Sequence, residues 1–388
     1  MNMGNTPGSS PLIDAARNLA PLLREYADRA EGERRLPDEV AAAFAKAGIF
    51  RMCTPKEIGG LETDPLTMSA TIEELARVDG SLAWCAMIIG AGGVNAALFS
   101  REGAAEAFAE STAGSFAPTG MVVETPDGYR ITGRWAFMSG IHASKYVGCT
   151  GVLMDGDKPH MTPFGPQMVI GMVPVGEGTI HDTWHVAGLR GTGSHDFEVQ
   201  DVLVPRTRAT PIPPREPPAF TSPLYRFPLW GFLSLSIASC AVGIARGAID
   251  ELTRMAKTKT PFGMMSSLST RATAQVAVSQ AEASLLSGRA MLHSEVAAMW
   301  DRVTSGTPPT PPDRARLRIA ATNAVTSAAH AVDLVYTAGG GSAVYAKSPL
   351  QRSFRDVHAI TQHTMVAPHG YELFGKILLG VEPDHPLL

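Results

Sequence analysis

Apolar residues recur every three or four positions between Leu12 and Glu110, which is the spacing of amphipathic helices. Pro21 should break or kink the first of these helices, because proline removes a backbone donor and crowds the preceding turn. Glycine and proline punctuation marks the other helix ends. The pattern predicts an all-helical N-terminal domain over residues 1–112, with helices over 12–26, 37–48 and 66–78 and after Asp79.

The pattern then changes to short β-rich runs separated by turn residues. Residues 121–125 and 129–137 flank the turn Pro126-Asp127-Gly128 and predict a hairpin. The proline-rich stretch 205–218 should hold no central strand or helix. We therefore expect a β-barrel-like central domain over residues 113–222, with further strands at 146–153, 168–175 and 195–205.

Long helical patterns return in the last part of the chain, residues 223–388, and a second proline-rich break interrupts them at 305–313. The helical runs are rich in alanine, the residue that favours helix most strongly. The fold class is therefore α+β and mainly α, ending in a four-helix bundle. The four helices are expected over 229–258, 266–303, 313–338 and 350–379.

Composition narrows the possible partners. Lys+Arg 33 against Asp+Glu 37 gives a net charge of −4, so nucleic acid is not an expected partner. Charged residues make up only 18% and hydrophobic residues 45%, a balance that favours large buried faces and subunit contacts. No uninterrupted apolar run has the roughly 18–20 residues of a membrane span. The start of the chain lacks a secretory signal, and the 4 cysteines lie far apart, so we expect a cytoplasmic protein with reduced thiols.

Several well-known catalytic motifs are absent. The sequence has no phosphate-binding P-loop, no H-E-x-x-H, no G-x-S-x-G and no dinucleotide-binding G-x-G-x-x-G between a strand and a helix. The glycines of 188–193 have the wrong spacing for that last motif. His181 and His185 are four residues apart but lie in a β or loop region, so we expect no metal site.

Four segments carry a resemblance to a known family. They are Gly133–Gly140, Gly188–Pro205, Lys259-Thr-Pro-Phe262-Gly263, and Gly340-Gly341 followed by 350–356. Their order and the helix–β–bundle organisation resemble the acyl-CoA dehydrogenase superfamily of flavoproteins over nearly the whole chain. The resemblance implies a homotetramer in which the segment matching R-x-x-F-G, with Lys259 in place of arginine, reaches the flavin's phosphate arm in a neighbouring subunit.

One departure points to a particular branch. Many of the dehydrogenases have a glutamate base shortly after the Arg-Asp pair, and that position falls at Thr364, which cannot act as the base. The segment Arg355–His363 instead resembles flavin-dependent monooxygenases typified by the oxygenase of hydroxyphenylacetate hydroxylase, secosteroid phenol hydroxylase and dibenzothiophene monooxygenase. In that branch residues matching His363 and Ser139 flank the flavin. The resemblance thus implies His363 and Ser139 as catalytic residues and Phe137, Met138, Ser139, Lys259, Phe262, Gly340 and Gly341 as cofactor-binding residues. Trp84 is a further candidate for contact with the cofactor, because the pocket needs an apolar lining.

The chemistry of such enzymes agrees with these residue types. Reduced flavin and O2 form a C4a-hydroperoxide, which survives in an apolar pocket that excludes water; Trp84, Phe137, Met138 and Ile141 would supply that lining. Ser139 would donate a hydrogen bond near the flavin N5 without adding charge. His363 would move a proton, since an unperturbed histidine titrates near neutrality. On the other interpretation, Ser139 satisfies a turn and His363 is a core histidine, with His358 or His369 active instead.

The expected partner follows from the missing nicotinamide motif: a separate NAD(P)H:flavin reductase would supply reduced FMN or FAD. The sequence thus predicts the oxygenase component of a two-component monooxygenase that hydroxylates an aromatic or otherwise hydrophobic small molecule. It leaves open the substrate, the choice of flavin, and oxygenation at carbon, nitrogen or sulfur. Two alternatives remain at this stage: an acyl-CoA dehydrogenase-like, FAD-dependent desaturase with a base elsewhere in the bundle, and a flavin-free helical scaffold.

Overall fold

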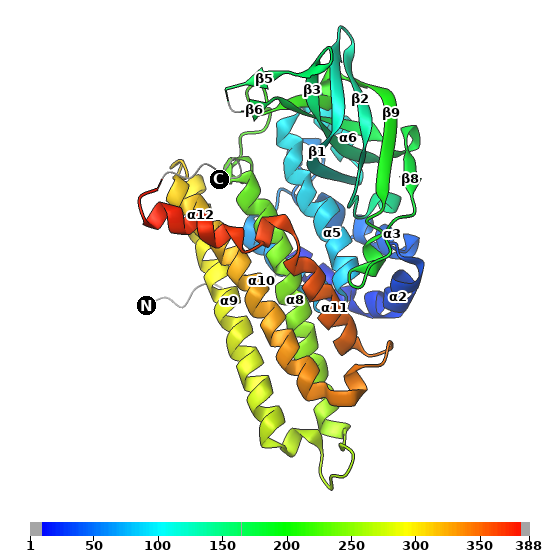
Figure 1. The fold of residues 1–388 in the computed structure, drawn as a ribbon, viewed down its shortest axis with the longest axis vertical. Helices are drawn as coiled ribbons and strands as arrows, with labels where there is room; N and C mark the ends of the chain where they lie inside the picture. The colour runs from blue at the N-terminus through cyan, green and yellow to red at the C-terminus, as the bar shows by residue number, and fades with distance from the viewer. Residues whose placement is uncertain (1–9, 164, 382–388) are drawn as a thin grey trace.

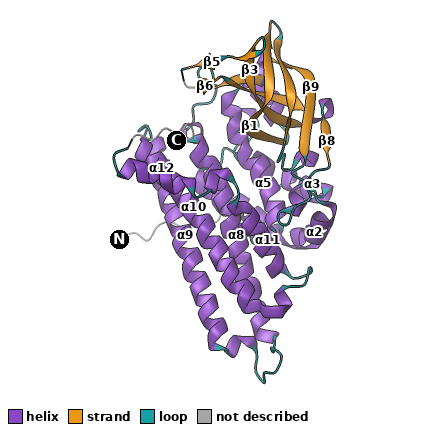
Figure 2. Cartoon of the chain, in the orientation of Figure 1, coloured by secondary structure: helices purple, strands orange, loops and turns teal. Residues whose placement is uncertain are grey.

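The computed structural model describes residues 10–163 and 165–381. A helical part forms most of the molecule, and a twisted β-sheet caps one end of it (Figure 1). Figure 2 shows that the strands lie together in that cap while helices make up nearly all of the rest. The α+β, mainly helical class predicted from the sequence is confirmed.

Most N-terminal helices start at or near the residues that the sequence marked, although the run expected to end at Tyr26 continues to Glu33. The first helical run is interrupted at Leu19, two residues before Pro21. Asp64 and Asp79 cap the fourth and fifth helices with their carboxylates, which satisfies backbone N–H groups left free at a helix start. The helices are α1 (Pro11–Asn18), α2 (Ala20–Glu33), α3 (Asp38–Lys46), α4 (Pro65–Ala76), α5 (Gly80–Gly92) and α6 (Arg101–Phe108).

The central sheet has the strand order β10-β7-β3-β1-β2-β9-β8, and the predicted hairpin is its β1–β2 pair. Strands β1 and β3 run parallel, and the other neighbours on this path run antiparallel. Trp135 is fully buried, and its ring lies so close to Gly120 and Gly133 that a Cβ at either would collide with it. The main strands are β1 (Thr112–Thr125), β2 (Gly128–Trp135), β3 (Tyr146–Asp155), β7 (Met168–Pro174), β8 (Thr179–His181), β9 (Asp196–Pro205) and β10 (Ala209–Ile212); the short β4 (Lys158–Pro159), β5 (Met161–Thr162) and β6 (Gly165–Pro166) lie at the periphery.

The C-terminal bundle departs from the prediction at its last helix. A continuous helix over 350–379 is wrong: the chain turns at η10 (Thr364–Val366), because Pro368 cannot continue a helix. His363 becomes the capping residue of this turn instead of a residue on a helix face. The bundle helices are α8 (Leu229–Thr258), α9 (Ala272–Thr304), α10 (Pro311–Gly339), α11 (Pro349–Thr361) and α12 (His369–Leu378).

Two helical segments are long and apolar enough to cross a membrane, Gly80–Leu98 and Leu229–Thr258, so the prediction that no segment reaches that length is wrong. Within Leu229–Thr258, glycine and serine interrupt the apolar run in sequence but do not end the helix, whereas Gly80–Leu98 changes from α-helix to 3₁₀ helix at Gly93. Both segments are mostly buried inside the protein, as core helices are.

The loop between β8 and β9 is held against the bundle at Gly188 and Leu189. The Leu189 N–H donates to Asp356 Oδ1 at 2.6 Å, and Arg355 donates to the carbonyl of Ala187. Gly188 has no room for a Cβ, which would stand 2.1 Å from the carbonyl oxygen of Arg355. Asp356 is buried, and burial, reinforced by the nearby Asp79 carboxylate, raises the pKa of Asp356 to about 7.

This raised pKa predicts a pH-dependent stability. The folded protein holds the Asp356 proton more tightly than the unfolded chain does, so this group's contribution to stability falls as pH rises from about 4 to about 7. Asp356→Asn keeps an oxygen for the Leu189 N–H and should reduce the fall by up to about 4 kcal/mol. The measurement is the free energy of unfolding between pH 4.5 and 8. Asp38→Asn, at an exposed carboxylate, is the control, and parallel profiles for Asp356→Asn and wild type would contradict the prediction.

Candidate active site

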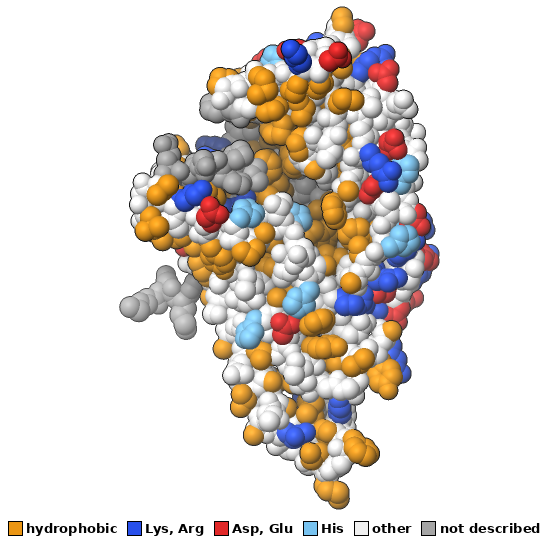
Figure 3. Space-filling view, in the orientation of Figure 1, with side chains coloured by type: hydrophobic (Ala, Val, Ile, Leu, Met, Phe, Trp, Pro, Cys, Tyr) orange, Lys and Arg blue, Asp and Glu red, His pale blue; other side chains and the backbone are white. Residues whose placement is uncertain are grey.

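Three side chains from the three parts of the chain meet where the sheet joins the helices. Trp84 on α5 donates from Nε1 to Ser139 Oγ at 3.0 Å, just beyond β2. The Trp84 ring also lies 5.9 Å from the ring of His363, between α11 and α12. The surface is hollowed between the β-domain and the bundle, and hydrophobic side chains line the visible part of the hollow (Figure 3). The structure thus brings together the two residues predicted to be catalytic and the tryptophan predicted to contact the cofactor.

Ser139 is the second group in a buried chain of hydrogen bonds. Ser139 Oγ lies 2.6 Å from Ser194 Oγ, which lies 2.6 Å from Thr192 Oγ1. Thr192 Oγ1 donates to the carbonyl of Leu189 at 2.8 Å. The three hydroxyls are each no more than 5% exposed.

The two ends of this chain fix the direction of every hydrogen bond in it. An indole N–H can only donate and a carbonyl can only accept. Thr192 donates its hydroxyl hydrogen to the Leu189 carbonyl, so its oxygen must accept from the Ser194 hydroxyl. The Ser194 oxygen must in turn accept from the Ser139 hydroxyl. Ser139 therefore accepts from Trp84 and donates to Ser194, and one lone pair on its oxygen remains free. This differs from the prediction that Ser139 donates to the flavin.

His363 is held as a neutral imidazole. Burial, with the positive charge of Arg318 adding to it, lowers the pKa of His363 to about 4. Its Nδ1 accepts from the Met365 N–H at 3.2 Å, so the neutral ring carries its hydrogen on Nε2. The residue type alone predicted a histidine that titrates near neutrality. The structure instead presents an uncharged N–H donor at physiological pH.

The side chains of the residues around Ser139 differ in their exposure to solvent. Phe137 has a positive φ of 64°, which is rare for an aromatic residue, and this places its ring 70% exposed and edge-on to Trp184. Met138 and Ile141 are fully buried in the core of the β-domain. Phe137 is therefore available to a ligand, whereas the side chain of Met138 faces the protein interior.

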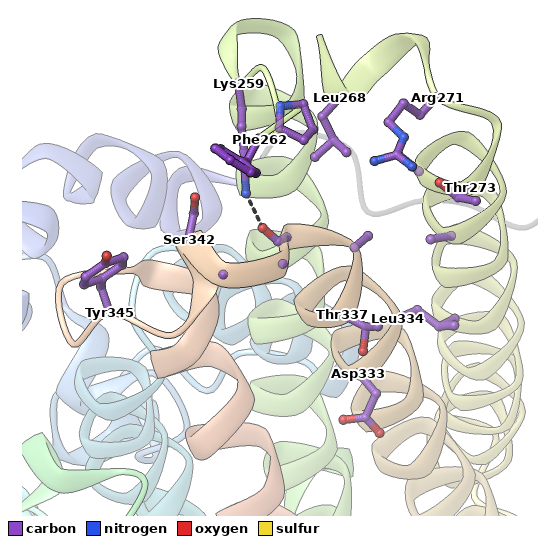
Figure 4. A pocket seen from close by; sticks show the side chains of 17 residues that line it. Lys259, Phe262, Leu268, Arg271, Thr273, Asp333, Leu334, Thr337, Ser342 and Tyr345 are labelled. Atoms are coloured by element: carbon purple, nitrogen blue, oxygen red, sulfur yellow. Dashed lines mark hydrogen bonds between the residues drawn. The ribbon is translucent and has the colours of Figure 1, made fainter. Parts of the chain in front are cut away.

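The remaining predicted cofactor residues lie together in a second place. Lys259 and Phe262, in the loop after α8, and Gly340 and Gly341, after α10, line a pocket of about 810 Å³ (Figure 4). Lys259 Nζ donates to the carbonyl of Gly339 at 2.5 Å, which holds the ammonium over this turn. Arg271 and Asp333, which carry opposite charges, also line the pocket.

The two groups of predicted residues are far apart within one chain. Ser234, near the start of α8, donates to the carbonyl of Met365 beside His363, whereas Lys259 follows the other end of this helix. At about 1.5 Å per residue, the stretch from Ser234 to Lys259 spans roughly 37 Å. One subunit therefore cannot offer both groups to the same end of a ligand.

The other histidines considered from the sequence have partners of their own. His358 Nε2 lies 2.8 Å from Asp333 Oδ1, and His181 Nε2 lies 2.7 Å from Glu198 Oε2. His185 lies 3.8 Å from the Asp182 carboxylate. Within residues 10–163 and 165–381, no group of three or more His, Cys, Asp or Glu is arranged to hold a metal ion.

Sequence reasoning missed three residues of this region. Thr192 and Ser194 lie in a segment that resembles the family, and the alternation of glycine with hydroxyl residues in Gly191-Thr-Gly-Ser194 was the available signal. No motif in the sequence pointed to Arg318. Its signal was an arginine at a core position of α10 with no acidic residue one turn away on either side.

Comparison with known proteins agrees with this geometry. Residues 12–108 match the family model of the acyl-CoA dehydrogenase N-terminal domain, and residues 235–368 match that of the C-terminal domain. An indole-3-acetate monooxygenase of Pseudomonas putida is 31% identical over 385 residues, covering 98% of this chain and 95% of that protein. The oxygenase subunit HsaA of a Rhodococcus jostii flavin-dependent monooxygenase is 30% identical over 371 residues, covering 92% and 95%.

A solved structure shows the same fold with a flavin present. XiaF from a Streptomyces species, in complex with FADH2 and glycerol, superposes with a TM-score of 0.90 at 26% identity and covers 97% of each chain. With 97% of this chain covered, the similarity extends over all three parts of the molecule. The chain belongs to the acyl-CoA dehydrogenase superfamily and, within it, to the flavin-dependent monooxygenases, as the sequence predicted.

Proposed function

We propose that this protein is the oxygenase component of a two-component system, in which a separate NAD(P)H:flavin reductase supplies reduced FMN or FAD. The chain would use that flavin and O2 to hydroxylate a small aromatic molecule in the cytoplasm. The observation that carries the proposal is the contact of Trp84, Ser139 and His363 at the junction of the three domains. The four cysteines are free and buried, which suits a reducing compartment.

The groups at the junction suit a reduced flavin. Bound reduced flavin supplies the electrons that activate O2, and it carries N–H groups, one of them on its central ring. The free lone pair of Ser139 can accept one of these hydrogens, because Trp84 and Ser194 already fix the orientation of its hydroxyl. The exposed ring of Phe137 offers an apolar face beside it.

His363 suits a second role at the same place. With Nδ1 occupied by the Met365 N–H, its Nε2–H can donate to an oxygen of the flavin or of the substrate. A neutral donor stabilises a developing negative charge without adding a buried cation. This is the role of a hydrogen-bond donor, and it replaces the role of a base that titrates near neutrality.

The distant pocket supports an oligomer. Lys259 and Arg271 offer positive charge, and the ring of Phe262 is fully exposed in the loop between them, although a large apolar ring normally packs against protein. A flavin bound at the junction of one subunit could meet this pocket only on another copy. We therefore propose a homotetramer in which this pocket holds the phosphate and, for FAD, the adenylate end of a neighbour's flavin.

Single-turnover mixing tests the proposed reaction. The protein is loaded anaerobically with reduced FMN or FAD, and the complex is mixed with ¹⁸O2 and a panel of aromatic compounds. The masses of the products are measured by mass spectrometry. We expect one ¹⁸O atom in a hydroxylated product, with no need for NAD(P)H once the flavin is reduced. Product lacking the label contradicts the proposal, and bleaching of oxidised flavin by an acyl-CoA without a reductase would identify a desaturase instead.

His363→Gln should separate product formation from cofactor binding. We expect the yield of hydroxylated product to fall about 10- to 100-fold, while the Kd for reduced flavin changes by less than about 3-fold. Because the pKa of His363 is about 4, wild-type kcat/KM should show no limb between pH 5.5 and 8 that the variant lacks. His358→Gln, at the half-exposed histidine paired with Asp333, is the control and should retain wild-type yield. Equal yields in both variants would remove His363 from the site.

Phe262→Ala tests the distant pocket. Loss of a ring that packs on an adenylate should weaken FAD binding about 3- to 10-fold and leave riboflavin binding unchanged. Met265→Ala is the matched control, because Met265 is equally exposed in the same loop but does not line the pocket. Sedimentation velocity should show a tetramer for all three proteins. A monomeric wild type, or equal FAD affinity in the two variants, would contradict this part of the proposal.

A further inference from the structure

Arg318 is a buried arginine without an anionic partner. Its side chain lies on α10 and is 2% exposed. Its Nη1 reaches only the thioether sulfur of Met365, at 3.9 Å, and its buried Nε has no hydrogen-bond acceptor. No Asp or Glu of the described residues lies within salt-bridge distance of it.

This is an unusual state for a buried cation. A guanidinium stays charged at physiological pH, and an unpaired charge inside a protein is costly. The other buried arginine of the described chain, Arg208, bonds to the Met172 carbonyl and pairs with Glu106. Arg352, which is mostly buried, faces the carboxylates of Asp28 and Asp79. Arg318 is thus the exception in a chain that otherwise neutralises such groups.

The guanidinium of Arg318 lies at the active-site end of the bundle. Met365, which it contacts, is two residues from His363 in the turn η10, which packs against both α8 and α10. The positive charge of Arg318 also contributes to the lowered pKa of His363, so the two side chains are electrostatically coupled. A ligand that reaches His363 therefore comes close to an unneutralised cation.

We propose that Arg318 binds the carboxylate of the substrate and that the substrates of this enzyme are aromatic carboxylic acids. The inference rests on the function proposed above and specifies the substrate class of the same site. A guanidinium offers two parallel N–H donors that match a carboxylate, and Met365 is too weak an acceptor to compete with it. The flavin phosphate is the less suitable anion, because the proposed homotetramer already provides it with Lys259 and Arg271 of a neighbouring subunit.

Binding to matched pairs of ligands tests this assignment. The probes are indole-3-acetate with 3-methylindole, and 4-hydroxyphenylacetate with 4-methylphenol, each titrated by calorimetry into the full-length protein with and without oxidised FMN. We expect at least one acid to bind about 30-fold or more tighter than its neutral partner. Arg318→Met should abolish that preference while leaving the affinity for the neutral partner within about 3-fold. Arg318→Lys should retain part of the preference, because it keeps the charge and loses the planar fork.

Stability and simple anions provide the controls. Replacing an unpaired buried charge with an apolar side chain of similar length should leave the melting temperature of Arg318→Met unchanged or higher. Acetate at the same concentrations should bind far more weakly than the aromatic acids. Equal affinity for acid and neutral partner in the wild type, no binding of either acid, or an unchanged preference in Arg318→Met would each overturn the proposal.

A separate measurement tests whether Arg318 binds the flavin phosphate and not the substrate carboxylate. If Arg318→Met weakened FMN binding but left riboflavin binding unchanged, the residue would hold the flavin phosphate and the proposal would be wrong. The same ligand pairs are then tested in single turnover with reduced flavin. Labelled product from acid and neutral partner at equal efficiency would retain the monooxygenase function and overturn the carboxylate assignment. Tight, Arg318-dependent binding of an acid without labelled product would retain the carboxylate assignment and overturn the monooxygenase function.

Discussion

The junction of the three domains depends on one chain of hydrogen bonds whose directions are fixed at both ends. It starts at the indole N–H of Trp84, passes through the hydroxyls of Ser139, Ser194 and Thr192, and ends on the carbonyl of Leu189. Because each hydroxyl has a single hydrogen, no member can reverse without leaving a buried polar group unsatisfied, which is expensive in a site of low polarity. The hydroxyl of Ser139 is therefore oriented before any ligand arrives.

The same chain links the site to the packing of the domains. Leu189, its terminal acceptor, is held by the buried carboxylate of Asp356 in the bundle, and the neighbouring Gly188 can approach the helix backbone only because it lacks a Cβ. Trp84 belongs to the N-terminal helices and Ser139 to the β-domain. Correct docking of all three parts is thus required for the hydroxyl to point in one direction, which explains why the site lies at their junction.

Electrostatics gives the junction its second property. Burial, reinforced by the positive charge of Arg318, keeps the imidazole of His363 from taking up a proton. The site combines an acceptor at Ser139, a neutral donor at His363 and a fixed positive charge. The acceptor suits an N–H of reduced flavin, and the neutral donor suits an oxygen of the flavin or substrate that becomes negative. The fixed positive charge suits the carboxylate of an acidic substrate.

The sequence predicted the elements well and the site only in part. Helical periodicity and capping residues located most helices, because these signals are local. The break near Pro368 was missed because the bundle pattern continues across it. The sequence assigned both Trp84 and Ser139 to the flavin pocket, but it could not predict their hydrogen bond or the role of Ser194, since each depends on a contact between residues 55 positions apart. The pKa of His363 and the isolation of Arg318 likewise depend on burial that no local pattern records.

The most direct test of the oriented hydroxyl compares the affinities for reduced and oxidised flavin in wild type and in Ser194→Ala. Reduced flavin has a hydrogen on its central ring nitrogen, whereas oxidised flavin has a lone pair there. An accepting Ser139 predicts that wild type binds reduced FMN at least about 10-fold tighter than oxidised FMN. Ser194→Ala frees the Ser139 hydrogen to donate, so the preference should shrink about 3- to 10-fold. A wild type without preference, or a variant with the wild-type ratio, would contradict the account.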